Sequence, residues 1–176
     1  MRIIAGSLKG RRLEAPAGVS VRPTADRARE ALFSILQRWP RGPFLDLFAG
    51  SGAVALEALS RGYGPVACVE RDPRALACIR ANARDAGLRI LARDATRLAA
   101  DSFGPQAVVF ADPPYEASAE LLAILGPRLK DWLAADGVLV WEAGHPSLLA
   151  APPGLDRLEA RRYGAAVFHI FRRACG

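Results

Sequence analysis

The 176-residue sequence has few of the side chains from which metal sites and disulfide frameworks are built. Its three cysteines, Cys68, Cys78 and Cys175, are odd in number and widely spaced, so they form neither a disulfide framework nor a CxxC pair. Cys68 falls in an apolar strand pattern and Cys78 in a helical pattern, which predicts buried structural thiols. The only histidines, His145 and His169, lack metal-ligand spacing, so neither zinc nor another metal is expected.

Long apolar runs are also missing. No stretch approaches the roughly 18 residues that a membrane span requires, and the opening residues 1–6 lack the apolar region of a signal peptide. We therefore expect a cytoplasmic protein without a membrane partner. The hydrophobic fraction of 51% and the mean hydropathy of +0.11 argue against disorder. The length suits one compact domain with a full core.

Basic residues outnumber acidic ones, and lysine is nearly absent. The net charge is +6, and 22 of the 24 basic residues are arginine. Such a field attracts polyanions, and the guanidinium fork suits phosphate. Charge alone is weak evidence for a nucleic-acid partner, because arginine-rich and alanine-rich usage is equally consistent with genome composition or a hot habitat.

The N-terminal region reads as a basic extension followed by a helix. Residues 2–15 predict a short β-hairpin, and residues 17–23 a loop. A helix is expected from about Thr24, which is a plausible N-cap, with Asp26 in its first turn. Pro40 and the glycine after it would end the helical region. We assign residues 1–23 to this extension and residues 24–176 to a catalytic core, within a single domain.

From residue 44 onward, strands and helices alternate. Strands are expected over residues 44–48, 66–70, 88–92, 107–111 and 138–142, and helices over residues 53–60, 73–87 and 117–133, with a short helical piece after Asp94. Residues 155–163 and 166–172 look like an antiparallel pair around Gly164. The pattern predicts an α/β fold with a mixed seven-stranded sheet that is mostly parallel, ends in an antiparallel hairpin and carries helices on both faces.

A glycine-rich turn follows the first of these strands, in the segment Asp46–Gly52. Gly50 and Gly52 allow a tight turn and the close approach of a ligand to the backbone. Glu70 closes the second strand, 18 positions after Gly52, where a carboxylate accepts hydrogen bonds from a ribose diol. Asp94 closes the third strand, and its neighbours are placed to bracket an adenine edge. Each of these carboxylates alone is also consistent with an ordinary helix cap.

The turn fits the dinucleotide pattern G-x-G-x-x-G/A, which does not by itself distinguish nicotinamide from other adenosine cofactors. Asp46 places a negative charge just before the glycines, where a cationic amino group can be held. No hydride-transfer constellation follows. S-adenosylmethionine has the ribose, the adenine, the ammonium group and an electrophilic methyl group, and it is the cofactor that we expect.

Residues Asp112, Pro113, Pro114 and Tyr115 follow the fourth apolar strand. The lone pair of a nucleobase amine is delocalised into the ring, so such a nitrogen is a poor nucleophile. Acceptors on both N–H bonds, the Asp112 carboxylate and the Pro113 carbonyl, favour a pyramidal nitrogen with an outward lone pair. The prolines stiffen the turn, and Tyr115 can stack on an extruded base. A plain strand end with a proline turn is the simpler alternative for this tetrapeptide alone.

These motifs give the chain a resemblance to a known family. It resembles the class I S-adenosylmethionine-dependent methyltransferases, which have a Rossmann-like fold, and more closely the RsmD-type enzymes that methylate N2 of a guanine in 16S ribosomal RNA. The residues that carry the resemblance are 3–11, 22–33, 46–52, 69–71 and 112–115. The segment Arg22–Phe33 is the most discriminating part, because the other motifs are widely shared. Many relatives have Phe at the position of Tyr115.

The resemblance and the residue patterns together predict three groups of site residues. The catalytic group is Asp112, Pro113, Pro114 and Tyr115. The cofactor group is Asp46, Phe48, Ala49, Gly50, Ser51, Gly52, Glu70, Arg71, Asp94, Ala95 and Asp112. The RNA-binding group is Arg2, Lys9, Arg11, Arg12, Arg22, Thr24 and Arg27. We expect a monomer whose substrate is ribosomal RNA within a small-subunit particle.

Other functions remain open at this point. One is methylation of an adenine or cytosine amine in DNA or another RNA, although the chain has little room for the target-recognition region usual in DNA enzymes. Methylation of a protein glutamine is another alternative, because a side-chain amide nitrogen is also a poor nucleophile. Enzymes of that kind more typically carry Asn at the position of Asp112. A catalytically silent RNA-binding module is a third alternative. Retention of Asp46, Glu70 and Asp112 together speaks against it.

Overall fold

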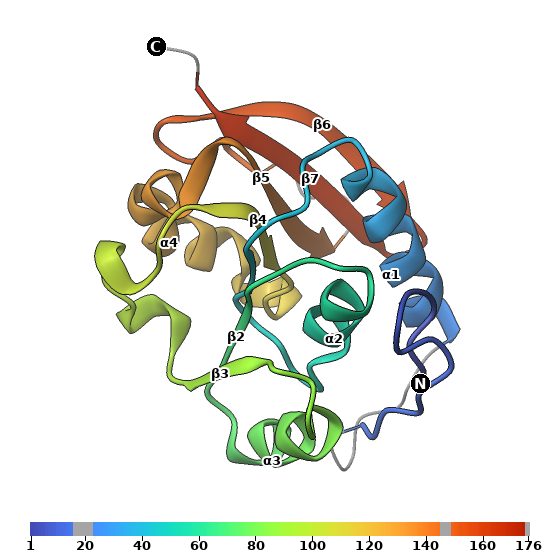
Figure 1. The fold of residues 1–176 in the computed structure, drawn as a ribbon. Helices are drawn as coiled ribbons and strands as arrows, with labels where there is room; N and C mark the ends of the chain where they lie inside the picture. The colour runs from blue at the N-terminus through green and yellow to red at the C-terminus, as the bar shows by residue number, and fades with distance from the viewer. Residues whose placement is uncertain (16–22, 145–148, 175–176) are drawn as a thin grey trace.

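Seven strands form one mixed sheet in the order β3-β2-β1-β4-β5-β7-β6 (Figure 1). The computed structural model describes residues 1–15, 23–144 and 149–174. The strands are β1 (Phe44–Asp46), β2 (Val66–Glu70), β3 (Arg89–Ala92), β4 (Gln106–Ala111), β5 (Leu133–Gly144), β6 (Leu155–Tyr163) and β7 (Ala166–Arg173). Strands β1 to β5 are parallel, and β7 is antiparallel to both β5 and β6. The predicted mixed sheet with its C-terminal antiparallel pair is confirmed.

Helices cover both faces of this sheet. The α-helices are α1 (Pro23–Leu36), α2 (Ala53–Ser60), α3 (Pro73–Asn82) and α4 (Ser118–Trp132), and the short 3-10 turns are η1 (Ala95–Arg97), η2 (Ala100–Ser102) and η3 (Tyr115–Ala117). Leu45 and Val109 point to the α4 face, whereas Phe44 and Val108 point to the face of α1, α2 and α3. Alternate residues of each central strand thus enter two separate apolar cores. This burial on both faces explains why the central strands read as continuous apolar runs.

The predicted element boundaries agree with the structure in some places and differ by up to five residues in others. Helix α2 and strand β2 have the predicted limits. Helix α3 ends at Asn82, five residues before the predicted stop at Gly87, because Asp85 already has a left-handed φ of 61°. Strand β5 begins at Leu133, five residues earlier than predicted. Strand β1 ends at Asp46 and not at Phe48, since the chain turns there toward the glycine-rich segment.

The N-terminal extension is less regular than the predicted hairpin. Its two arms meet in a single antiparallel bridge between Arg2 and Arg12, and Gly10 N–H donates to the Ile3 carbonyl at 2.9 Å. The strands do not extend further, because the backbone N–H groups of Ile4 and Ala5 donate to a side chain of α2. Ile3 is buried against the same helix. The extension is therefore packed onto the core.

Other sequence expectations concern thiols and membranes. Cys68 and Cys78 are buried free thiols, as predicted, whereas Cys175 and His145 lie outside the described residues. Within the described ranges, no helix has the length and apolar character needed to cross a bilayer. The same residues contain no cluster of three or more His, Cys, Asp or Glu side chains able to hold a metal ion.

Candidate active site

A cavity of about 730 Å³ opens at the carboxyl ends of the parallel strands. Strand β1 has β2 on one side and β4 on the other, so the chain reverses its direction of travel across the sheet at this point. Open α/β sheets bind their ligands at such a switch point. The volume lies within the range of roughly 300–1,000 Å³ that is typical of small-molecule sites. The lining residues are Leu47, Phe48, Gly50, Val69, Glu70, Arg71, Arg93, Asp94, Ala95, Asp112, Pro113, Pro114, Tyr115, Glu116, Ala117 and Leu121.

The glycine-rich turn forms one wall of the cavity. Gly50 has a left-handed φ of 54°, and a Cβ built on it would meet nothing within 4 Å. A side chain there would extend into open space beside the backbone, which is the space that a bound ligand needs. Gly52 has a different role, because its Cβ would approach Ile79 Cγ2 of α3 at 3.3 Å.

Glu70, at the end of β2, ties this wall to the next strand. Its Oε2 accepts a hydrogen bond from Gly50 N–H at 2.9 Å. Its Oε1 accepts from Arg71 N–H at 2.7 Å and from Asp72 N–H at 2.8 Å. The carboxylate therefore stands on the cavity surface with a fixed orientation.

Asp94, at the end of β3, combines a capping role with a position on the cavity wall. It accepts from Thr96 N–H at 2.9 Å and from Thr96 Oγ1 at 2.8 Å, and Arg71 Nη1 lies 2.8 Å from its Oδ2. The hydrogen bonds from Thr96, followed by the Arg71 guanidinium, hold the pKa of this carboxyl below its usual value. The cap alternative considered from the sequence is present, and the same side chain also faces the cavity.

Asp46 is buried behind the turn, with 1% of its surface exposed. Burial raises its pKa to about 8, and Asp112 adds to this effect, while backbone N–H groups of Phe48 and Ala55 oppose it. Its Oδ1 has no hydrogen-bond partner among the described residues. Asp46, Ala49, Ser51 and Gly52 are the predicted cofactor residues that do not line the cavity.

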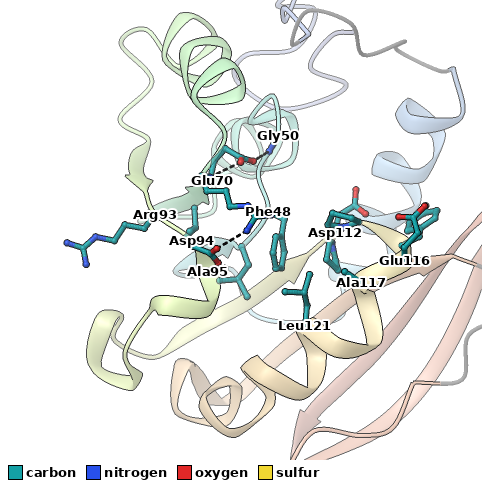
Figure 2. Close-up of a pocket in the computed structure, with 16 residues that line it drawn as sticks. Phe48, Gly50, Glu70, Arg93, Asp94, Ala95, Asp112, Glu116, Ala117 and Leu121 are labelled. Carbon is teal, nitrogen blue, oxygen red and sulfur yellow. Dashed lines mark hydrogen bonds and ion pairs between the residues drawn. The ribbon is translucent and has the colours of Figure 1, made fainter.

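The segment that follows β4 forms the opposite wall. Asp112, Pro113, Pro114 and Tyr115 all line the cavity. In Figure 2 the Phe48 ring stands between this wall and the group of Glu70, Asp94 and Ala95. Asp112 is reached by solvent through the cavity, yet the surrounding protein atoms raise the pKa of its carboxyl to about 6. It is thus largely ionised at neutral pH and able to accept hydrogen bonds.

Sequence reasoning missed Glu142, the last acidic residue of β5, and the lining residue Glu116. Glu142 is 9% exposed, and the Tyr115 hydroxyl donates to its Oε1 at 3.0 Å. Burial raises the pKa of Glu142 to about 8, Asp112 raises it further, and the bond from Tyr115 lowers it. The sequence could have indicated Glu142 as a candidate site residue, because it is the last residue of the predicted fifth strand, just as Glu70 is the last residue of the second.

The predicted RNA-binding residues do not all lie together. Arg2, Lys9 and Arg27 line a second hollow of about 260 Å³ between the extension and α1, which also includes Asp26 and Glu30. Arg12 is exposed nearby in the chain, and Arg11 Nη2 donates to the Arg84 carbonyl at 3.2 Å. Arg22 lies outside the described residues, as does the side chain of Thr24.

Glu57 of α2 anchors this basic region. Its carboxylate is fully buried and accepts from Ile4 N–H at 2.7 Å, from Ala5 N–H at 3.0 Å and from Arg61 Nε at 2.7 Å. Arg29 of α1 approaches it at 3.6 Å and donates to the Arg2 carbonyl at 2.6 Å. The extension, α1 and α2 therefore share one buried polar contact.

The cavity suits a cationic, ribose-bearing cofactor. Fixed acceptors stand at one end, the open backbone of Gly50 lies beside them, and the apolar faces of Phe48 and Leu121 lie between the walls. Carboxylates of Glu70, Asp94 and Asp112 favour positive charge inside it. These residues fit a cofactor of the S-adenosylmethionine type, which carries a ribose and a positive charge.

Comparison with known proteins adds independent findings. Residues 1–172 match the model of a family described as conserved hypothetical protein 95. Ribosomal RNA small subunit methyltransferase D of Escherichia coli K12 is 32% identical over 180 residues, covering 98% of this chain and 90% of the relative. A putative rRNA methyltransferase, YlbH, of Bacillus subtilis is 40% identical over 124 residues, covering 66% and 67%. A solved structure, the putative methyltransferase yhhF from Escherichia coli, has a TM-score of 0.81 and 31% identity, covering 100% and 99%.

Proposed function

The chain belongs to the family described as conserved hypothetical protein 95, and we propose that it is an S-adenosylmethionine-dependent methyltransferase acting on N2 of a guanine in small-subunit ribosomal RNA. The observation that supports this most strongly is the shared cavity. It places the glycine turn and Glu70 on one wall and Asp112, Pro113 and Tyr115 on the other. Relatives named as ribosomal RNA methyltransferases point to the same substrate class.

The proposed chemistry assigns separate tasks to the two walls. When bound, S-adenosylmethionine supplies the electrophilic methyl group. Asp112 and the Pro113 carbonyl accept hydrogen bonds from the two N–H bonds of the guanine amine, which directs its lone pair into the cavity. Tyr115 stacks on the base, and unstacking that base from the RNA costs a few kcal/mol. Asp112, ionised at neutral pH, or water takes the proton that the amine loses.

The basic extension is proposed to hold the RNA. Arg2, Lys9, Arg11 and Arg12 carry positive charge on the segment that Glu57 fixes to α2, and Arg27 adds charge from the neighbouring helix α1. Helix α2 begins directly after Gly52 of the cofactor turn, so the RNA grip and the cofactor wall share one support. We propose a partly assembled small subunit as the substrate particle and a monomer as the acting form.

Tritiated methyl transfer to purified small subunits, large subunits, tRNA and DNA tests this function. We expect label in small-subunit RNA, released as N2-methylguanosine on nucleoside digestion. Label confined to DNA, tRNA or large subunits would refute the substrate. A titration with S-adenosylmethionine that shows no binding would refute the enzyme class, since a silent RNA-binding module need not hold this cofactor.

A further inference from the structure

Glu142 is a buried carboxyl that does not line the cavity but bonds to the lining residue Tyr115, and the proposed reaction leaves it without a task. It has 9% of its surface exposed. Among the described residues, no arginine or lysine lies within ion-pair distance of it. Burial of a carboxyl without an ion-pair partner opposes folding. Carboxyls of this kind are typical of functional sites. The Tyr115 hydroxyl, 3.0 Å from Oε1, is the side-chain donor that the structure places on Glu142.

The Tyr115 ring is held at a second point. Gly144, two residues after Glu142, packs against the ring, and a Cβ built there would come within 2.8 Å of Tyr115 Cδ2 and 3.1 Å of its Cγ. A side chain at residue 144 would therefore push the ring away. The hydroxyl and the flank of Tyr115 are both fixed by the end of β5, while 44% of its surface stays exposed. This exposed part of the ring is the surface on which we expect the base to stack.

The end of β5 is itself a rigid support. Glu142 pairs with Phe168 of β7, and Gly144 pairs with Ala166. Trp141 Nε1 donates to Ser118 Oγ at 2.9 Å, which ties the strand to the start of α4. A side chain that is anchored on a paired strand holds its partner more precisely than one on a loop.

We propose that Glu142 is a positioning residue for the target base, which acts through the Tyr115 hydroxyl to set the plane of the stacking ring relative to Asp112. The inference rests on the proposed function and assigns a second task at the same site. Burial and the nearby Asp112 both raise the pKa of Glu142, which favours the protonated form of this side chain. In that form Glu142 stands near Asp112 without adding a second negative charge beside the acceptor for the amine.

Kinetics of matched variants test the proposal. Glu142→Ala removes the acceptor, Tyr115→Phe removes the donor and keeps the ring, and Glu142→Gln keeps an acceptor oxygen. We expect the first two each to lower kcat/KM for RNA about tenfold, the effect of one hydrogen bond of about 1.4 kcal/mol. Glu142→Gln should stay within about threefold of the wild type. The Glu142→Ala, Tyr115→Phe double variant should be no worse than either single variant, because both break the same hydrogen bond.

Gly144→Ala provides a test that leaves the carboxyl in place. It should lower kcat/KM about as much as Glu142→Ala, because it displaces the same ring. In every variant the affinity for S-adenosylmethionine should stay within about twofold, and thermal melting reports the folded fraction. Wild-type kcat/KM in Glu142→Ala would overturn the proposal, as would equal losses in Glu142→Gln and Glu142→Ala or independent, multiplying losses in the double variant. Absence of methyl transfer by the wild type would instead refute the proposed function.

Discussion

Two groups of enclosed carboxyls in this molecule have opposite surroundings. Glu57 is fully buried but meets two backbone N–H groups and the Arg61 guanidinium, with Arg29 at 3.6 Å. Asp46 and Glu142 are buried, Asp112 lies on the cavity wall within reach of solvent, and none of the three has an ion pair among the described residues. Desolvation by the surrounding protein raises the pKa of each. A buried carboxylate that has hydrogen-bond and ion-pair partners connects parts of the fold, as Glu57 does. Unpaired burial opposes folding and is typical of binding and catalytic sites.

Removal of Glu57 is the strongest test of the claim that a buried, paired carboxylate holds parts of the fold together. Glu57→Ala leaves Arg61, Arg29 and two N–H groups without their partner, so we expect a loss of roughly 3–5 kcal/mol in the free energy of unfolding. Urea denaturation measures it. Glu159 offers a matched control, since it pairs with Arg38 and Arg161 at the surface. Glu159→Ala should cost less than about 1 kcal/mol. Equal losses would show that the buried network does not act as an anchor.

Removal of Asp112 tests the claim that a carboxyl without an ion pair serves binding or catalysis. Asp112→Ala should lower kcat about 100- to 1,000-fold, because the target amine loses an acceptor that matters most in the transition state. The affinity for S-adenosylmethionine should stay within a few-fold. Single-turnover methyl transfer at saturating RNA and cofactor measures the effect. Glu120→Ala, on the exposed surface of α4, serves as the control. Unchanged turnover in Asp112→Ala would remove this side chain from the chemistry.

The pH dependence of stability gives a third test. A carboxyl with a raised folded-state pKa binds a proton more tightly in the folded chain, so its contribution is complete below about pH 4 and declines as the pH rises toward about 8. We therefore expect Tm to fall between pH 5 and pH 9, by about 2–4 °C for each kcal/mol lost. Glu142→Gln should flatten this decline. The lowered pKa of Asp94 acts at more acidic pH and does not contribute in this window. A Tm that rises over the same range would contradict the assignment.

The smallest expected effect concerns the basic extension. Replacing Lys9, Arg11 and Arg12 with Gln should weaken RNA binding and reduce the salt slope by about 0.7–0.9 for each phosphate that the protein no longer neutralises. Filter binding at several salt concentrations measures the slope. Removal of equal charge at Arg162, Arg172 and Arg173, on the β6–β7 pair, is the control. Equal changes in both triple variants would show that net charge matters and the extension does not.

The sequence predicted the sheet and most element limits because glycine, proline and apolar periodicity are local signals. Helix α2, between Gly52 and Gly62, shows how closely such signals fix an element. The packing of the extension was not predictable in the same way, since it depends on Glu57, a charged residue in helical sequence whose partners are 52 and 53 positions away. Glu142 was missed although it ends a predicted strand. Its link to Tyr115 requires the spatial proximity of two segments 27 positions apart.

The central claim is that the carboxylates at the strand ends form one compartment for the cofactor and the target amine. A crystal structure of the protein with S-adenosylhomocysteine tests it most directly. We expect the ribose hydroxyls on Glu70, the adenine beside Asp94 and Ala95, and the sulfur facing Asp112 and the Pro113 carbonyl across open space. A ligand bound elsewhere, or one whose sulfur faces away from Asp112, would contradict the account.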